Sequence, residues 1–543
     1  MRKFGAVLVC AFFSTHCTRE GCPTGFIPSG SMCVPLADTG SVVSDAGVDA
    51  HAVDTFVPPD ATPCGAQLQC MGMCVDPLTD RNNCGACGVR CDLLQGCNMG
   101  TCNQPVALLQ SAENDAVVAV ADSPNGVLHC VAGNAHASST WTDGARSVPL
   151  ASPVSGLVEC TLSDGSVIAS IRTQTGPTVS SPADGEEGIH DIALASGKTY
   201  IVGATRGTFQ LQATAAVNTA IGLDGFIART HPDGMFDNLF MLTGPGDSSV
   251  EAIDTDEVVG TSTTVCYGGW FTPFTQFDTP ISTVPNAGGR DAFVSCKINE
   301  GTALNWWFGA AGDDAVTGIA VVDGYVYVVG HLSGPVIHGA TAPYLGSNAG
   351  GDDAFLLRIS LATNQPDFGV VWGSTGADSA TDVVADAARI AITGHCAGAI
   401  AGALPSCADN QDGFLVLLDA TAPTTTLAAQ LLQSPFADAY ESVALGTSIF
   451  ATGHIGAAAS AGALSIPHAG ADGTRDVVVA RYMLNGSPIE AFSWGSAANE
   501  TGNAIAATAS DVISVGGTFD GTASIAGTPV VSMGASDGFL VRR

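Results

Sequence analysis

Acidic residues recur at one position of a repeated pattern in this chain. Each stands five residues before an isoleucine or valine of a strand-like run, at Asp115, Glu187, Asp314, Asp378, Asp438 and Glu500. If these carboxylates form a rim around one opening, their oxygens could bind a hard cation, and calcium is the only ion that we consider here; we expect no other cofactor. The alternative is that each acid caps a tight turn by accepting hydrogen bonds from backbone amides.

Histidines and aromatic residues also share aligned positions. His331, His395 and His454 would bind a metal only if they converged within about 2.1 Å of one ion. The alternative is that they replace a small polar residue and cover loop backbone. Aromatic residues stand six positions before three of the acids, and they could stack on a sugar or pack between sheets: Phe308, Trp372 and Trp494.

Catalytic motifs are scarce. The chain has no His-Glu-x-x-His, no Walker loop and no dinucleotide fingerprint. A hydrolase or lyase could still draw two carboxylates from distant parts of the chain. We therefore name no catalytic residue and favour a binding protein over an enzyme, with an inert envelope component as a third reading.

A repeat organises these residues. A strand-like run ends in a glycine at Gly133, Gly203, Gly269, Gly330, Gly394, Gly453 and Gly517, with spacings by subtraction of 70, 66, 61, 64, 59 and 64. One clear unit, residues 370–419, divides into four short antiparallel strands, and third strands of other units begin at Asp224, Asp291, Asp353, Asp476 and Asp537. Four strands per unit and seven units predict an all-β fold, a seven-bladed β-propeller over residues 104–543.

The two ends of this region complement each other. The last unit stops after its third strand, whereas residues 106–111 form an orphan strand that matches the outer strands elsewhere. We expect this N-terminal strand to complete the last blade and to close the ring.

The pattern Gly-Asp-Asp-Ala, then Val-Tyr-Val-x-Gly, then Asp-Ala-Phe-Leu resembles the bacterial seven-bladed propeller repeat family called SBBP. The resemblance implies the fold and export, and the family has no shared catalytic residues to carry over. Blades one and two depart most from the pattern. The long loops after the second strands (134–154, 270–290, 331–352 and 454–475) should crowd one face and carry recognition of a glycan or a surface protein.

The N-terminus has the form of a secretory signal. Arg2 and Lys3 precede an apolar run of about ten residues, whereas a membrane span needs about 20. We expect a signal peptide at 1–16 and a lipidated Cys17, whose position resembles that of bacterial lipoproteins although His16 departs from the usual small residue. Residues 17–35 would form a small loop closed by Cys22 and Cys33, and residues 36–62 a disordered acidic linker.

Residues 63–103 contain eight cysteines, and the spacing Asn-Cys-Gly-x-Cys-Gly-x-x-Cys resembles the module of the stigma-specific protein family. We expect a disulfide-rich module here, because an exported chain with an even cysteine count favours disulfides over the zinc site that Cys84-x-x-Cys87 could contribute to. The connectivity is not derivable from sequence.

Cysteines within the repeats fall at matching places. Cys130 and Cys266 each stand three residues before a repeat glycine, and Cys160 and Cys296 match in the following strand. The shared register predicts the disulfides Cys130–Cys160 and Cys266–Cys296, and the remaining cysteines predict Cys396–Cys407. Reduced buried thiols are the alternative.

Charge limits the partners. With 51 acidic and 18 basic residues, the net charge of −33 would repel nucleic acid and anionic lipid. We expect a monomer at the cell surface or outside the cell, in contact with a membrane only through its lipid anchor.

Overall fold

The computed structural model describes residues 26–29, 32–35 and 67–542. Within the last range, it leaves out residues 71–72, 81, 90–95, 104–105, 124, 136–138, 144–145, 151–155, 164–165, 176–186, 212–216, 232–233, 259–261, 274–285, 302, 337–344, 347–348, 399–405 and 408–410. The chain divides into two units, Met1–Pro63 and Cys64–Arg543. In the first unit, β1 (Phe26–Ser29) pairs with β2 (Met32–Pro35). The predicted signal peptide, Cys17, Cys22 and the linker at 36–62 lie outside the described residues.

The cysteine-rich module contains two short hairpins. β3 (Leu68–Cys70) pairs with β4 (Met73–Val75), and β5 (Gly96–Asn98) pairs with β6 (Thr101–Asn103). Disulfides join Cys70 to Cys87 and Cys84 to Cys97. Covalent links of this kind stabilise a module with too little apolar core to fold alone.

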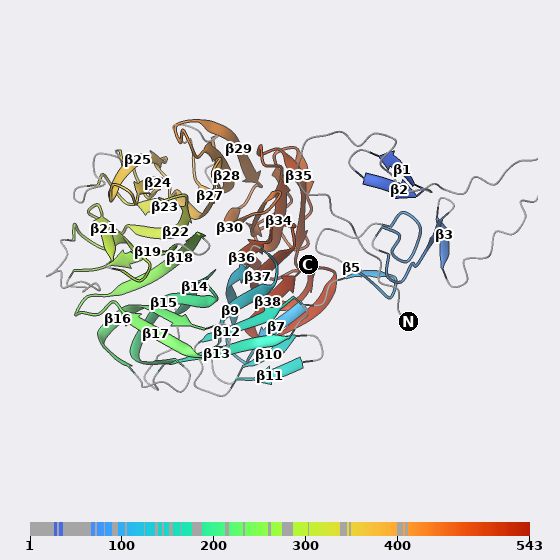
Figure 1. Ribbon diagram of the computed structural model, residues 1–543, viewed down its shortest axis with the longest axis horizontal. Coiled ribbons are helices and arrows are strands. Elements are labelled where there is room, and N and C mark those ends of the chain that lie inside the picture. The colour runs from blue at the N-terminus through green and yellow to red at the C-terminus, as the bar shows by residue number, and fades with distance from the viewer. Residues whose placement is uncertain are drawn as a thin grey trace, which may run out of the picture. The chain divides into compact units, whose positions relative to one another are not determined.

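Seven antiparallel four-stranded units form a ring (Figure 1). Blades 1 to 3 consist of β8 (Ala116–Asp122), β9 (Leu128–Asn134), β12 (Gly156–Leu162) and β13 (Val167–Thr175); β14 (Gly188–Ala195), β15 (Lys198–Leu211), β16 (Val217–Thr230) and β17 (Phe236–Met241); and β18 (Ser248–Val258), β19 (Ser262–Phe271), β20 (Asp291–Ile298) and β21 (Leu304–Phe308). Blades 4 and 5 consist of β22 (Ala315–Val322), β23 (Tyr325–Leu332), β24 (Asp353–Ser360) and β25 (Gln365–Trp372); and β26 (Ser379–Ala385), β27 (Arg389–Cys396), β28 (Asp412–Asp419) and β29 (Thr426–Gln433). Blades 6 and 7 consist of β30 (Ala439–Leu445), β31 (Ile449–Ile455), β34 (Asp476–Tyr482) and β35 (Pro488–Trp494); and β36 (Glu500–Ala507), β37 (Ile513–Ile525), β38 (Thr528–Arg542) and β7 (Val106–Gln110).

The closing strand lies where the sequence predicts it. β7 pairs antiparallel with β38, with Leu109 opposite Gly538 and Val106 opposite Val541. The first propeller strand therefore completes the last blade, and the ring has no open edge at this point.

The repeated glycine has a packing reason. A Cβ atom added at Gly330 would lie 2.0 Å from the carbonyl oxygen of Ala315, and one at Gly453 would lie 2.0 Å from that of Ala439. The inner strand crosses so close to the second strand that only glycine fits.

Sheet packing accounts for the apolar third strands. β24 is buried along most of its length, because neighbouring blades cover both faces of a sheet. Between blades 3 and 4, the rings of Phe308 and Phe355 pack edge to face with centroids 5.5 Å apart.

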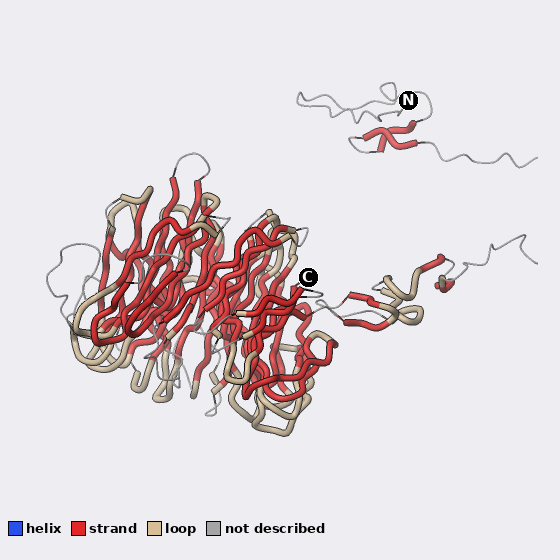
Figure 2. Tube along the Cα trace, turned by 90° about the horizontal axis from the view of Figure 1, so that it is seen from below, coloured by secondary structure: helices blue, strands red, loops and turns tan. Residues whose placement is uncertain are grey.

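Two of the long loops expected to carry recognition contain hairpins. β10 (Thr140–Asp143) pairs with β11 (Arg146–Pro149), and β10 then adds to β7 in the sheet of the previous blade. Likewise, β32 (Ala459–Ala461) pairs with β33 (Leu464–Ile466) and adds to β29. In the side view, the described loops lie at the ends of the strands (Figure 2). The hairpins connect adjacent blades, and they pair with backbone groups that the edge of each outer strand would otherwise expose.

Disulfides join Cys130 to Cys160, Cys266 to Cys296 and Cys396 to Cys407, which confirms the two pairs predicted from the repeats and the one predicted from the remaining cysteines. The first two link opposed residues of adjacent strands. Several disulfides in one chain fit an oxidising compartment. Among the described residues, no helix is long and apolar enough to cross a membrane.

Candidate functional site

The acids predicted to form a rim lie inside the protein. Asp314, Asp378, Asp438 and Glu500 are 0% exposed, and Asp115 is 2% exposed. The carboxylate of Asp378 accepts hydrogen bonds from the backbone amides of Ser374 at 2.6 Å and of Ala397 at 2.7 Å. These acids hold the turn between blades to the loop after the second strand, which is the geometry of the turn-capping alternative.

The other acids of this set have similar surroundings. Asp314 accepts from the backbone amides of Ala310 at 2.5 Å and Ser333 at 2.7 Å. Glu500 accepts from that of Ser496 at 3.0 Å. Glu187 instead lies 3.3 Å from the guanidinium of Arg206.

A second buried acid stands near five of the six turn acids, Glu187 being the exception. The amide of Asp378 donates to the carbonyl of Asp352, next to Asp353, which begins the third strand of the preceding blade. Burial, with a smaller contribution from the nearby Asp378, raises the pKa of Asp353 to about 6. The same arrangement recurs around the ring, where burial raises the pKa of Asp438 and of Glu500 to about 7 each. Buried acids of this kind hold protons at a pH at which surface carboxylates have lost theirs.

The three aligned histidines lie near carboxylates. His454 is 3% exposed, and its Nδ1 atom lies 3.3 Å from Oε1 of Glu441. Burial lowers the pKa of His331 and of His395. In the part of the chain that the structure describes, no group of three or more His, Cys, Asp or Glu residues could hold a metal ion.

The aligned aromatic residues belong to the core. Phe308, Trp372 and Trp494 are 0%, 3% and 5% exposed. They pack between blades and offer no open face for a sugar.

The inner strands of all seven blades line a central cavity of about 520 Å³. Every inner strand has a bulge at the same place, where one residue is skipped in the pairing. The skipped residues all line the cavity: Val118, His190, Glu251, Thr317, Thr381, Glu441 and Asn503. A bulge re-aims a side chain, and here it adds one residue per blade to the cavity wall.

Aspartates of the cavity connect neighbouring blades. Asp191 accepts from the backbone amide of Ile253 in the next blade at 2.9 Å, and Asp254 accepts from that of Val321 at 2.7 Å. Burial raises the pKa of Asp191 to about 8 and that of Asp254 to about 7. These aspartates were not among the residues selected from the sequence, because they occupy different positions of their strands, Asp191 directly after the bulge and Asp254 three residues after it.

One carboxylate of the cavity, that of Glu251, has a lowered pKa, in contrast to the aspartates. Burial alone would raise the pKa of Glu251, but His190, whose Nδ1 lies 3.1 Å away, and other donors hold it at about 2. Glu251 is therefore ionised while Asp191 is protonated at neutral pH.

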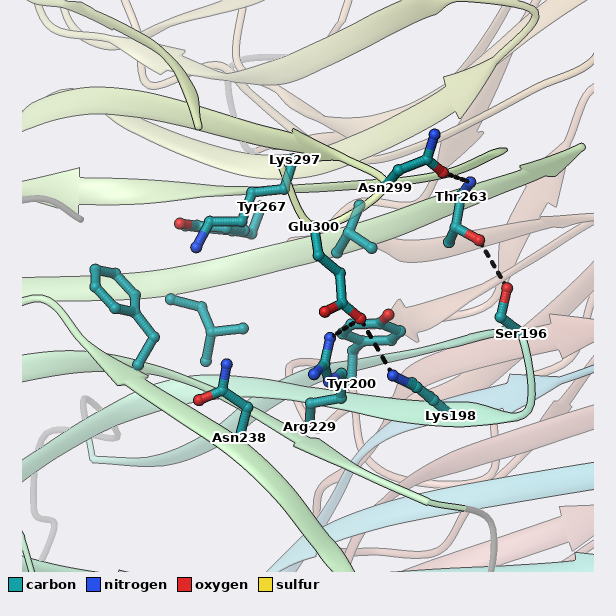
Figure 3. A pocket seen from close by; sticks show the side chains of 13 residues that line it. Ser196, Lys198, Tyr200, Arg229, Asn238, Thr263, Tyr267, Lys297, Asn299 and Glu300 are labelled. Atoms are coloured by element: carbon teal, nitrogen blue, oxygen red, sulfur yellow. Dashed lines mark hydrogen bonds and ion pairs between the residues drawn. The ribbon is translucent and has the colours of Figure 1, made fainter. Parts of the chain in front are cut away.

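A separate cleft of about 380 Å³ opens between blades 2 and 3 (Figure 3). Its walls come from strands β15, β16 and β17 on one side and β19 and β20 on the other. Three cationic side chains line it: Lys198, Arg229 and Lys297. None of them was selected from the sequence, because the first and last stand about a hundred residues apart and belong to no motif.

Ion pairs occupy part of this cleft. Nζ of Lys198 lies 3.1 Å from Oδ2 of Asp237 and 3.2 Å from Oε1 of Glu300. Nε of Arg229 lies 2.7 Å from the same Asp237 oxygen, and its terminal nitrogen also pairs with Glu300.

Aromatic rings form the inner wall. Tyr200 and Tyr267 are 7% and 3% exposed, and Nζ of Lys297 lies 5.2 Å from the centroid of Phe240. Beyond the rings, Asn299 accepts from the backbone amide of Thr263 at the turn where the cleft meets solvent. The cleft thus combines apolar faces, hydrogen-bonding groups and positive charge, as small-molecule sites do.

One stretch fits the letters Gly-x-Ser-x-Gly, at residues 534–538. It lies inside β38, whereas a nucleophile elbow requires a turn from a strand into a helix. The stretch is part of the sheet.

No family model matches this chain, and no curated protein matches it. Similar solved structures include the Dos1 propeller, with 10% identity over 81% of this chain and 95% of that one and a TM-score of 0.39. The β-propeller domain of Cps50 (Swd1) from Myceliophteria thermophila has 8% identity over 80% of this chain and 98% of that one, with a TM-score of 0.39. Hydrazine synthase from Kuenenia stuttgartiensis has 8% identity over 78% and 97%, with a TM-score of 0.38. Since all three scores are low, the blade count rests on the strand pairing of this chain, and by that pairing the chain is a seven-bladed β-propeller closed by its N-terminal strand.

Proposed function

We propose that this chain is an exported, lipid-anchored bacterial surface protein whose propeller binds a glycan or a surface protein. Three features of the sequence support export and anchoring: the signal-like N-terminus, the lipoprotein-like position of Cys17, and the resemblance to the SBBP repeats and to the stigma-specific module. The disulfides of the propeller agree with an oxidising compartment.

The observation that carries the binding role is the cleft between blades 2 and 3. It is open to solvent at its turns, and rigid strands hold charged and aromatic side chains around it. A closed ring with disulfides within blades supplies a scaffold that changes little on binding, which lowers the entropic cost of association.

A glycan array probed with the folded, mature chain tests the proposal, together with capture of labelled surface proteins. We expect binding to a restricted set of glycans or to one surface protein. A chain that binds neither would contradict the binding role.

Anchoring has its own test. We expect the Cys17→Ser variant to lose incorporation of labelled fatty acid and to leave the membrane fraction. A wild-type chain that incorporates no labelled fatty acid would contradict the lipid anchor.

A hydrolase or lyase using carboxylates of the central cavity is the second candidate. It is favoured by the divergent pKa values of Asp191, about 8, and Glu251, about 2, since a protonated and an ionised carboxyl in one cavity are the pair that acid–base catalysis needs. The enzymatic role would be supported if the wild-type chain cleaves a polysaccharide and both Asp191→Asn and Glu251→Gln lose this activity. Binding of a polysaccharide without turnover would exclude the enzymatic role.

A further inference from the structure

We infer that the cleft between blades 2 and 3 binds a carboxylated sugar, such as a uronic acid residue of a surface polysaccharide. The inference rests on the proposed binding function and names its site and its ligand class. It depends on four features: the charge of the cleft, its departure from the repeat, its aromatic wall and its exposed acid.

Positive charge is concentrated here. The chain has three lysines in 543 residues, and two of them, Lys198 and Lys297, line this one cleft together with Arg229. The three cations exceed the two carboxylates that pair with them, Asp237 and Glu300, so in a molecule of net charge −33 the cluster provides a local attraction for an anion.

The repeat shows that these lysines are not needed for the fold. Lys297 stands four residues after Phe293, and the aligned residue in blade 5 is Leu418, four after Phe414. Leu418 is 1% exposed and fills the space between blades 4 and 5 with apolar packing. The ammonium group at the aligned place in blade 3 leaves that space open and charged.

Lys198 is a second position in this cleft where the residue differs from the repeat. Lys198 precedes its repeat glycine by five residues, as Tyr325 does in blade 4. There, the guanidinium of Arg358 lies over the Tyr325 ring, 4.7 Å from its centroid. Arg229 aligns with Arg358, but it has a lysine beside it instead of a ring. Blade 2 therefore presents two adjacent cations where blade 4 closes the gap.

The aromatic wall favours a sugar over a simple anion. Tyr200, Phe240 and Tyr267 line the cleft. The two tyrosines are buried, so the half-buried ring of Phe240 is the one that could stack on the C–H face of a pyranose, while amides bond the hydroxyls. The volume of about 380 Å³ falls in the range of small-molecule sites, about 300–1,000 Å³.

Glu300 marks the place of the ligand carboxylate. Its side chain is 61% exposed, and Oε1 bridges Lys198 and Arg229 from the turn at the mouth of the cleft (Figure 3). An exposed carboxylate is easily displaced, so a ligand carboxylate could take over both cations while Asp237 keeps its pair with Arg229.

The test is isothermal titration calorimetry of the mature chain with D-glucuronate, D-glucose and inorganic sulfate. We expect glucuronate to bind at least about tenfold more tightly than glucose or sulfate. Equal binding of sulfate would reduce the site to a simple anion site and overturn the inference, as would equal binding of glucose.

Two variants copy residues that the repeat already uses. Lys297→Leu and Lys198→Tyr should each weaken glucuronate binding by about tenfold or more with an unchanged circular dichroism spectrum. The matched control is Arg389→Gln, since Arg389 also stands five residues before its repeat glycine. Arg389 belongs to blade 5, outside the cleft, and its guanidinium lies 2.7 Å from the carboxylate of Asp386. Unchanged binding in folded Lys297→Leu, or an equal loss in Arg389→Gln, would overturn the inference.

The two proposals fail separately. If the wild-type chain and Lys297→Leu bind array glycans or a protein equally well, the binding function stands but the assignment of this cleft fails. A wild-type chain that binds nothing would contradict both.

Discussion

At the scale of single residues, the recurrent positions of this chain serve the packing of the ring. Most of the acids that the sequence pattern selects are buried turn caps, with Glu187 paired to Arg206 instead, and the aligned aromatic residues are core. Spacing along the chain shows that a position recurs, but it does not show whether a carboxylate faces solvent or a backbone amide, because both uses require an acid at the end of a strand.

The repeat glycines give a direct residue-scale prediction. Gly453→Ala should lower the free energy of unfolding by about 3 kcal/mol or more, because the new Cβ would meet the carbonyl oxygen of Ala439. The control is Gly346→Ala, where nothing lies within 4 Å, and it should change stability by less than about 0.5 kcal/mol. Urea unfolding measures both, and equal effects would contradict the packing argument.

The buried acids predict an unusual pH dependence. Burial raises the pKa of Asp191, Asp254 and Asp438 to about 8, 7 and 7, so between pH 5 and 8 the folded chain holds protons that the unfolded chain has lost. Stability should therefore fall as the pH rises through this window, with a melting temperature about 5 °C or more higher at pH 5 than at pH 8.

Thermal unfolding across this range checks the sign. Burial lowers the pKa of His331 and His395, which acts in the opposite direction, but the raised acids outnumber them. Asp438→Asn should flatten the profile, since its side chain cannot ionise. Stability that rises between pH 5 and 8 would contradict the protonated state of these acids.

At the scale of elements, the sequence predicts the strands and their order well and the added hairpins not at all. The four strands of each blade are local and periodic, so residues 370–419 already show them. The pairing of β10 with β7 and of β32 with β29 joins segments of different blades, and nothing in the sequence of a loop states which edge it will cover. The cleft was missed for the same reason, since Lys198 and Lys297 meet only through the packing of two blades.

The β10–β11 hairpin can be tested through its buried anchor. Trp141 is 2% exposed, and its indole donates to Oε1 of Glu159 at 3.0 Å. Trp141→Ala should cost about 3–5 kcal/mol of stability through the cavity that it leaves. Hydrogen exchange should show faster exchange at Thr140–Asp143, and unchanged protection there would mean that the hairpin does not depend on this ring.

At the scale of the whole molecule, closure by β7 makes the two ends of the propeller interdependent. Leu109 is 0% exposed and lies opposite Gly538, so Leu109→Asp should detach the closing strand and expose the edge of β38. We expect a lower unfolding midpoint and association of the variant in light scattering. The exposed Glu113, changed to Gln, is the matched control, and a monomeric, fully stable Leu109→Asp chain would contradict closure by this strand.

The seven bulges have a consequence for protein engineering. Pairing resumes on either side of each skipped residue, so the identity of that residue does not enter the hydrogen-bond ladder of its blade. Side chains at four of these sites hydrogen-bond to the backbone carbonyl that precedes the bulge of the next blade: His190 to Val250, Thr317 to Ala380, Thr381 to Tyr440 and Asn503 to Val117. A combinatorial library varied at the seven sites would therefore diversify the lining of the cavity across every blade and leave the framework constant only where those four positions retain a hydrogen-bond donor.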